Sequence, residues 1–125
     1  MNEFNFTPQQ QAASREKIVG AFGLARRAGK CQIGSEICVD LIRKNKAKLA
    51  LIADDVSDNT KKKVLNACSF HNVECLNIGI GKYELGSKLG KKSGITCAVI
   101  TDEGFVNICR KIYSEVQKQS MEVQH

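Results

Sequence analysis

The sequence has no tryptophan, two tyrosines and two histidines, and each of these shortages argues against a class of function. A protein that binds single-stranded nucleic acid by stacking its bases needs an aromatic platform, which this composition does not offer. Catalytic Ser-His-Asp or Cys-His groups need a histidine, and only His71 and the terminal His125 are available. Apolar runs of about 20 residues are also absent, so no transmembrane helix is predicted.

Close cysteine pairs are missing as well, although the chain contains six cysteines. Cys-x-x-Cys spacing, which most zinc sites use, does not occur. His71 lies between Cys68 and Cys75, and we interpret this cluster as core packing because Cys68 falls on an apolar helix face. The segment MNEFNFTPQQQAA has neither the basic nor the apolar region of a signal peptide. We therefore predict a cytoplasmic protein with reduced thiols and without a metal or cofactor.

Positive charge is what the sequence has in excess, with 19 Lys and Arg against 13 Asp and Glu and a net charge of +6. Residues 13–112 carry 18 basic and 10 acidic side chains, so both ends of the chain are slightly acidic. Such a field favours a polyanionic partner, either nucleic acid or an anionic membrane surface. A surface that only keeps the protein soluble is the alternative.

Hydrophobic spacing predicts alternating helices and strands. Helices are expected from Ser14 to Gly29, over 35–45, from 58 past 68, over 82–89 and over 102–113. Strands are expected over 30–33, 49–53, 73–78 and 95–100. This order predicts an α/β fold with a sheet between two layers of helices. We expect a flexible N-terminal arm over residues 1–13, a single domain over 14–113 and a frayed C-terminal tail over 114–125.

Two acidic pairs could carry chemistry, Asp54-Asp55 and Asp102-Glu103, because each follows a predicted buried strand. Both pairs also stand where a helix begins, where carboxylates bind free amides and complement the helix dipole. We favour capping, and we expect no catalytic residues. A small enzyme or redox protein that uses these acids or the thiols is an alternative.

Several segments together resemble the ribosomal protein L7Ae/L30e family, with spacing most like its stand-alone bacterial members. The resemblance covers about residues 16–112. It implies a three-layer α-β-α sandwich with a mixed central sheet of about four strands. It also implies binding of kink-turn RNA, a sharply bent helix that contains sheared G·A pairs. The segments that carry it are Gly34-Ser35-Glu36, Ala47 to Asp55, Asn59-Thr60-x-Lys62-Lys63, Leu85-Gly86-x-x-x-Gly90, Ala98-Val99-Ile100 and Thr101-Asp102-x-Gly104-Phe105.

The family contacts RNA through the start of its second helix, typically Gly-x-Asn-Glu-x-x-Lys. Of the matching positions here, Gly34, Ser35, Glu36, Ile37 and Asp40, only the glycine agrees. Glu36 can still accept hydrogen bonds from a guanine edge, whereas Ile37 cannot, and Asp40 would repel a phosphate. Alternatively, Ile37 is buried and Asp40 pairs with Lys44 four residues later.

The family's second contact is the loop before the last strand, which here reads Lys91-Lys92-Ser93 and suits phosphate. We predict a monomeric, non-enzymatic protein that binds structured ribosomal or regulatory RNA and no membrane. A protein-interaction module on the same fold is the alternative. The predicted RNA-binding residues are Lys30, Gly34, Ser35, Glu36, Ile37, Asp40, Lys44, Lys82, Lys91, Lys92 and Ser93.

Overall fold

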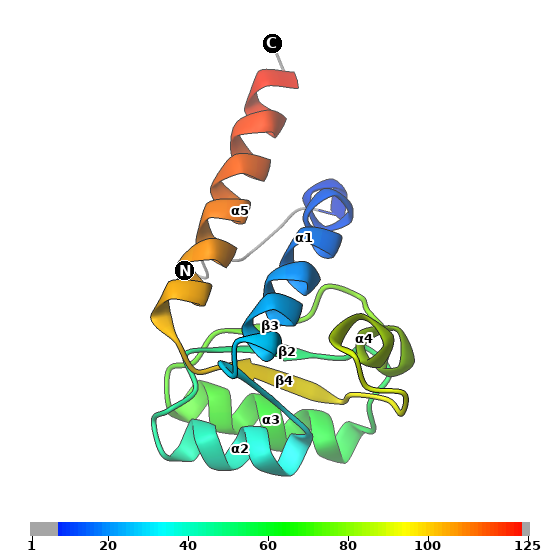
Figure 1. Ribbon diagram of the computed structural model, residues 1–125, viewed down its shortest axis with the longest axis vertical. Coiled ribbons are helices and arrows are strands. Elements are labelled where there is room, and N and C mark those ends of the chain that lie inside the picture. The colour runs from blue at the N-terminus through cyan, green and yellow to red at the C-terminus, as the bar shows by residue number, and fades with distance from the viewer. Residues whose placement is uncertain (1–7, 124–125) are drawn as a thin grey trace.

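The computed structural model describes residues 8–123, and over this range helices and strands alternate as the sequence predicts (Figure 1). The helices are α1 (Pro8–Arg27), α2 (Ser35–Arg43), α3 (Asp58–Phe70), α4 (Lys82–Leu89) and α5 (Glu103–Val123). The strands are β1 (Cys31–Ile33), β2 (Leu49–Ile52), β3 (Cys75–Leu76) and β4 (Cys97–Ile100).

The four strands form one mixed sheet in the order β1-β4-β2-β3. Strand β4 runs antiparallel to both of its neighbours, and β2 is parallel to β3. All four residues of β2 and all four of β4 are buried. Continuous apolar strands of this kind form where both faces of a sheet are covered.

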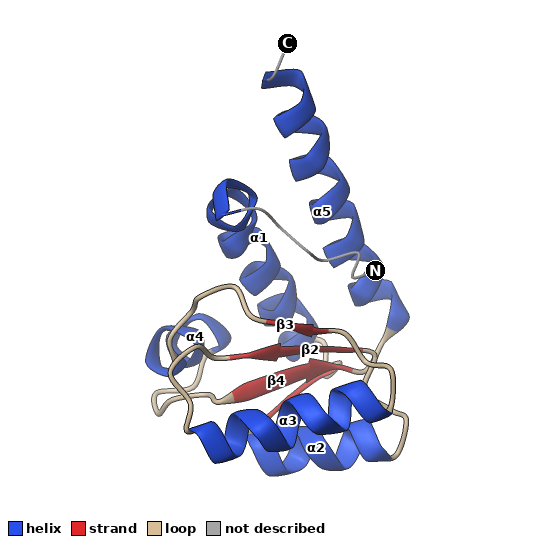
Figure 2. Ribbon diagram, turned by 180° about the vertical axis from the view of Figure 1, so that it is seen from behind, coloured by secondary structure: helices blue, strands red, loops and turns tan. Residues whose placement is uncertain are grey.

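Helices cover both faces of the sheet, which confirms the predicted α-β-α sandwich (Figure 2). Side chains of β2 alternate between the two faces, as the two-residue period of a strand requires. Leu49 and Leu51 pack with residues of α1, α4 and α5. Ala50 and Ile52 pack with residues of α2 and α3 on the other face. Two hydrophobic clusters therefore hold the sheet between them.

Both terminal helices are longer than hydrophobic periodicity predicts. Helix α1 begins at Pro8, so the part of the expected arm from residue 8 to 13 is helical, and residues 1–7 lie outside the described range. Helix α5 continues to Val123, through most of the expected tail. Proline suits the first position of a helix, and Gln, Ala, Glu and Lys favour helix without an apolar pattern.

The topology brings several connecting segments to one end of the sheet. Strands β1, β2 and β3 end there and β4 begins there, as three backbone hydrogen bonds show. Gly34 N–H donates to the Cys97 carbonyl at 2.9 Å, Ala53 N–H to Thr96 at 2.9 Å and Asp54 N–H to Ile80 at 2.8 Å. We call this the loop end, and it comprises residues 34–36, 53–57, 77–81 and 90–96.

Candidate functional site

The start of α2 is shaped by a glycine that a side chain would strain. Gly34 has φ 101° and ψ 135°, a backbone conformation that residues with a Cβ rarely adopt. Its carbonyl accepts the N–H of Cys38 at 2.9 Å and begins the helix. Since no side chain caps α2, the first-turn amides lie at the positive end of the helix dipole without a side-chain acceptor. This helix start can therefore bind an anion or a hydrogen-bond acceptor.

The loop that carries Lys91 and Lys92 lies directly on α4. Lys91 N–H donates to the Gly86 carbonyl at 2.8 Å. A Cβ on Gly86 would meet the Ser93 carbonyl oxygen at 2.5 Å and that of Lys91 at 2.8 Å, so only glycine permits this approach. Ile95, which is 1% exposed, fixes the end of the loop and donates its N–H to Lys82 at 2.9 Å. The two lysines therefore extend from an anchored backbone.

One acid of each pair caps a helix, which confirms the capping prediction for Asp102 and gives Asp55 another helix than the one expected. Asp102 Oδ2 accepts the Phe105 N–H at 3.4 Å, within its own helix start. Asp55 differs in its target, because its Oδ1 accepts the N–H of Lys82 at 2.7 Å and so caps α4. Ser57 caps α3 instead, accepting the Thr60 N–H at 3.2 Å. Asp55 thus joins the turn after β2 to the start of α4.

Eight of the predicted RNA-binding residues gather around the loop end, and three do not. Lys30 precedes β1 at the opposite end of the sheet, where its carbonyl accepts the Thr101 N–H at 2.9 Å. Lys44 follows the last residue of α2, and a nine-residue helix is about 13 Å long. Asp40 lies between the two ends. The eight are Gly34, Ser35, Glu36, Ile37, Lys82, Lys91, Lys92 and Ser93.

On the outer side of α2, one part of the alternative interpretation is confirmed and the other is not. Asp40 does pair with Lys44, at 3.0 Å between Oδ2 and Nζ. Ile37, however, is 53% exposed, so the alternative in which it is buried was wrong. Cys38, Val39 and Ile42 face the sheet, and this phase turns Ile37 outward. An exposed apolar side chain therefore stands in the first turn of α2.

Tyr83 is a surface residue that the sequence reasoning missed. It is 67% exposed, and the ammonium of Lys82 lies 5.4 Å from the centroid of its ring. A cation over an aromatic face is attracted by the ring quadrupole. The signal in the sequence was the position of this tyrosine beside a predicted RNA-binding lysine.

The thiols have the environment of packed side chains. Five of the six cysteines are buried and Cys75 is half-buried, and all six are free. Burial raises the pKa of Cys31 and that of Cys109 to about 12, which keeps both thiols neutral. Neutral thiols are poor nucleophiles, so the environments of Cys31 and Cys109 do not favour redox or catalytic use. Within residues 8–123, no three His, Cys, Asp or Glu side chains are grouped to hold a metal ion.

Over the described part of the chain, no helix is both long enough and apolar enough to cross a membrane.

Fold and site together define a small α-β-α protein with an uncapped helix start and a lysine-bearing loop at one end of its sheet. The model of the ribosomal protein L7Ae/L30e/S12e/Gadd45 family matches residues 16–110, and the chain belongs to this family. This confirms the resemblance seen in the sequence.

Two curated relatives carry the name RNA-binding protein YlxQ. The protein from Enterococcus faecium is 35% identical over 99 residues, which cover 79% of this chain and 93% of the relative. The protein from Bacillus subtilis (strain 168) is 39% identical over 85 residues, which cover 68% of this chain and 83% of the relative. By their names, the family and these relatives are ribosomal and RNA-binding proteins, which confirms the prediction of a protein that is not an enzyme.

A solved structure shares the fold. A protein of unknown function from Bacillus halodurans C superimposes with a TM-score of 0.70 at 26% identity. The match covers 78% of this chain and 97% of that one.

Proposed function

We propose that this protein binds structured RNA of the kink-turn type through the loop end of its sheet. The observation that supports the proposal is the hydrogen bond from Gly34 to Cys97, which joins the start of α2 to the first residue of β4, the strand that follows the Lys91–Lys92 loop. The names of the YlxQ relatives support RNA as the ligand class. The family description names ribosomal proteins, and we propose a ribosomal or regulatory RNA as the ligand.

In this proposal, different groups at the loop end contact different parts of a bent RNA duplex. The amides at the start of α2 donate to RNA, and the carboxylate of Glu36 accepts from the edge of a guanine. Lys82, Lys91 and Lys92 contact phosphates, which supply most of the affinity and its dependence on salt. Ile37, exposed in the same helix turn, packs against a base or ribose displaced by the bend.

Asp40 is compatible with this arrangement because its charge is already paired. Its bond to Lys44 reduces the repulsion that a nearby phosphate would experience. Lys44 and Lys30 lie away from the loop end, so we propose that both add to the long-range positive field that attracts RNA.

The test is an electrophoretic mobility shift with a kink-turn duplex and an unbent duplex of equal length, over a series of salt concentrations. We expect tighter binding of the kink-turn. Equal affinity for the two RNAs would refute recognition by shape. Absence of binding to either RNA at low salt would refute the RNA proposal and favour a protein-interaction module.

A pair of double variants separates contact from net charge. Lys91→Ala with Lys92→Ala removes two cations at the loop end, and Lys46→Ala with Lys48→Ala removes two exposed cations at the other end. Affinity falls as salt rises, and we expect the first pair to make this slope of log affinity against log salt shallower by about 1.8, since each phosphate contact contributes about 0.9. The second pair should leave the slope almost unchanged. Equal effects of the two pairs would mean that only net charge matters.

A further inference from the structure

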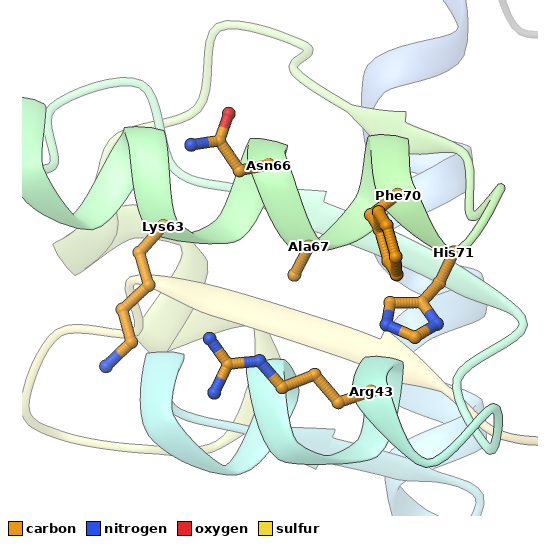
Figure 3. A pocket seen from close by; sticks show the side chains of 6 residues that line it. All are labelled: Arg43, Lys63, Asn66, Ala67, Phe70 and His71. Atoms are coloured by element: carbon orange, nitrogen blue, oxygen red, sulfur yellow. The ribbon is translucent and has the colours of Figure 1, made fainter.

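A second feature lies on the outer face of the helix layer formed by α2 and α3. An open depression of about 640 Å³ lies between the two helices (Figure 3). Its lining comprises Arg43 from α2, Lys63, Asn66, Ala67 and Phe70 from α3, and His71. None of the proposed contacts at the loop end belongs to this set.

The depression runs along the two helices toward the ends that lie away from the loop end, since Arg43 is the last residue of α2 and Phe70 is the last of α3. Helices α2 and α3 each follow a strand that ends at the loop end, so both helices begin there and run away from it side by side (Figure 2). Lys63 lies in the second turn of α3, and Phe70 is its last residue. Seven residues of helix separate the two by about 10 Å. A single strand that leaves an RNA bound at the loop end therefore has to run along the outer face of the two helices, about 18 Å from the start of α3, to reach Phe70.

An aromatic ring and two cations face this space. Phe70 is 83% exposed, the largest exposed fraction among the large apolar side chains described. His71 contacts it edge to face, with the ring centroids 5.0 Å apart and the planes at 76°. In Figure 3 the guanidinium of Arg43 and the side chain of Lys63 lie on the other side of Ala67 from Phe70, and both residues are exposed. An exposed aromatic face can stack on a base while neighbouring cations hold a phosphate.

The composition of the lining favours a nucleotide over an acidic peptide. No carboxylate belongs to the lining, and its apolar part is confined to Phe70 and Ala67. A peptide in a groove is held mainly by several apolar anchors. A nucleotide needs one stacking surface and a cation for its phosphate, and the lining offers both.

We propose that this depression binds one unpaired nucleotide of the RNA that is held at the loop end. The base stacks on Phe70, and its phosphate lies between Arg43 and Lys63. The proposal rests on the proposed function for the RNA itself. A single ring accepts a single base, which agrees with the shortage of aromatic residues needed for a longer stacking platform.

The first test compares a blunt kink-turn duplex with the same duplex carrying a three-nucleotide single-stranded extension. We expect the wild-type protein to bind the extended RNA about tenfold more tightly, as one base stacked on an aromatic ring implies. Phe70→Ala should abolish this gain, and Phe70→Tyr should keep it. Leu24→Ala on α1 is the matched control, because Leu24 is 49% exposed on the other helix layer.

The second test measures the charges. Arg43→Ala and Lys63→Ala should each reduce the salt dependence of the gain, and the double variant should reduce it by about 0.7 in slope, the contribution of the one single-stranded phosphate that the two cations share. Lys111→Ala, an exposed cation on α5, should not change it. A gain that is insensitive to both depression variants would overturn the phosphate contacts.

Equal affinity for blunt and extended RNA would overturn the proposal, as would an equal loss of affinity for both RNAs in Phe70→Ala.

A second measurement separates this proposal from the kink-turn proposal if the blunt duplex does not bind. It follows the fluorescence of a short single strand that contains 2-aminopurine. Quenching by wild-type protein and not by Phe70→Ala would support the depression while the kink-turn proposal fails. Without quenching both proposals fail. If a poly-glutamate peptide displaces the single strand and binds more tightly than the RNA, the nucleotide proposal fails and the depression is assigned to a protein partner.

Discussion

Replacement of Gly86 by alanine tests the anchoring of the lysine-bearing loop. We expect it to destabilise the protein, whereas the same substitution at another helical glycine should stabilise it. Alanine normally stabilises a helix interior by about 1 kcal/mol relative to glycine. At Gly86 the new Cβ would lie 2.5 Å from the Ser93 carbonyl oxygen and 2.8 Å from that of Lys91. Both are backbone atoms, so the loop must move as a unit.

The expected cost exceeds the gain in helix propensity. Overpacking of a tight contact costs about 1–3 kcal/mol. Moving the loop also weakens the hydrogen bond from Lys91 to Gly86, which is worth about 1 kcal/mol. The net loss is then about 2 kcal/mol, or a decrease of about 8 °C in Tm for a domain of this size. Because Lys91 and Lys92 are displaced, RNA affinity should fall as well.

Gly20→Ala is the matched control. Gly20 lies inside α1, and a Cβ there would meet nothing within 4 Å. We expect this variant to be up to about 1 kcal/mol more stable than wild type. Thermal unfolding followed by circular dichroism measures both variants. If Gly86→Ala is as stable as Gly20→Ala, the close approach of the loop to α4 is not a constraint and the reasoning is refuted.

Three other predictions concern the helix starts and the buried thiols. Gly34→Ala should cost about 1–3 kcal/mol of unfolding free energy from backbone strain alone, since no atom crowds that position. Normal stability in chemical denaturation would contradict the positive φ. Asp55→Ala should lower the stability by about 1–2 kcal/mol while Asp55→Asn, which keeps the acceptor for Lys82, should lower it less; a loss of RNA binding at unchanged stability in both variants would instead argue for a direct role. Burial raises the pKa of Cys31 to about 12 from a usual 9.0, so the folded state favours the neutral thiol. The contribution of this thiol to the free energy of unfolding should therefore be complete below pH 9 and should decrease as the pH rises toward 12. Cys31→Ala should reduce that dependence in denaturation midpoints, and an unchanged pH profile would refute the contribution of this thiol.

The order of the elements could be predicted from the sequence because glycines and apolar runs mark it. Helix α4 has the predicted bounds, Lys82–Leu89, between flanking glycines. The start of α1 could not be located in the same way, since its first residues form a helix by propensity without an apolar stripe. Periodicity detects only the buried face of an element.

Placement of the site was harder to predict than the fold. Lys30 and Gly34 are four residues apart in sequence, yet an extended strand separates them and puts them at opposite ends of the sheet. The phase of α2 was ambiguous, because both Ile37 with Leu41 and Cys38 with Ile42 form apolar pairs at helical spacing. Packing on the sheet selects Cys38 and Ile42 as the buried pair, and no local rule contains that information.

The bond from Asp55 to the start of α4 has a consequence for local opening of the fold. It joins residues 27 positions apart, so the cap of α4 exists only when the turn after β2 is in place. Helix α4 in turn carries the lysine loop through Gly86. Hydrogen exchange should therefore show the amides of the β2–α3 turn, of α4 and of the loop exchanging as one cooperative unit. Ligand that orders any one of these segments would slow exchange in all three.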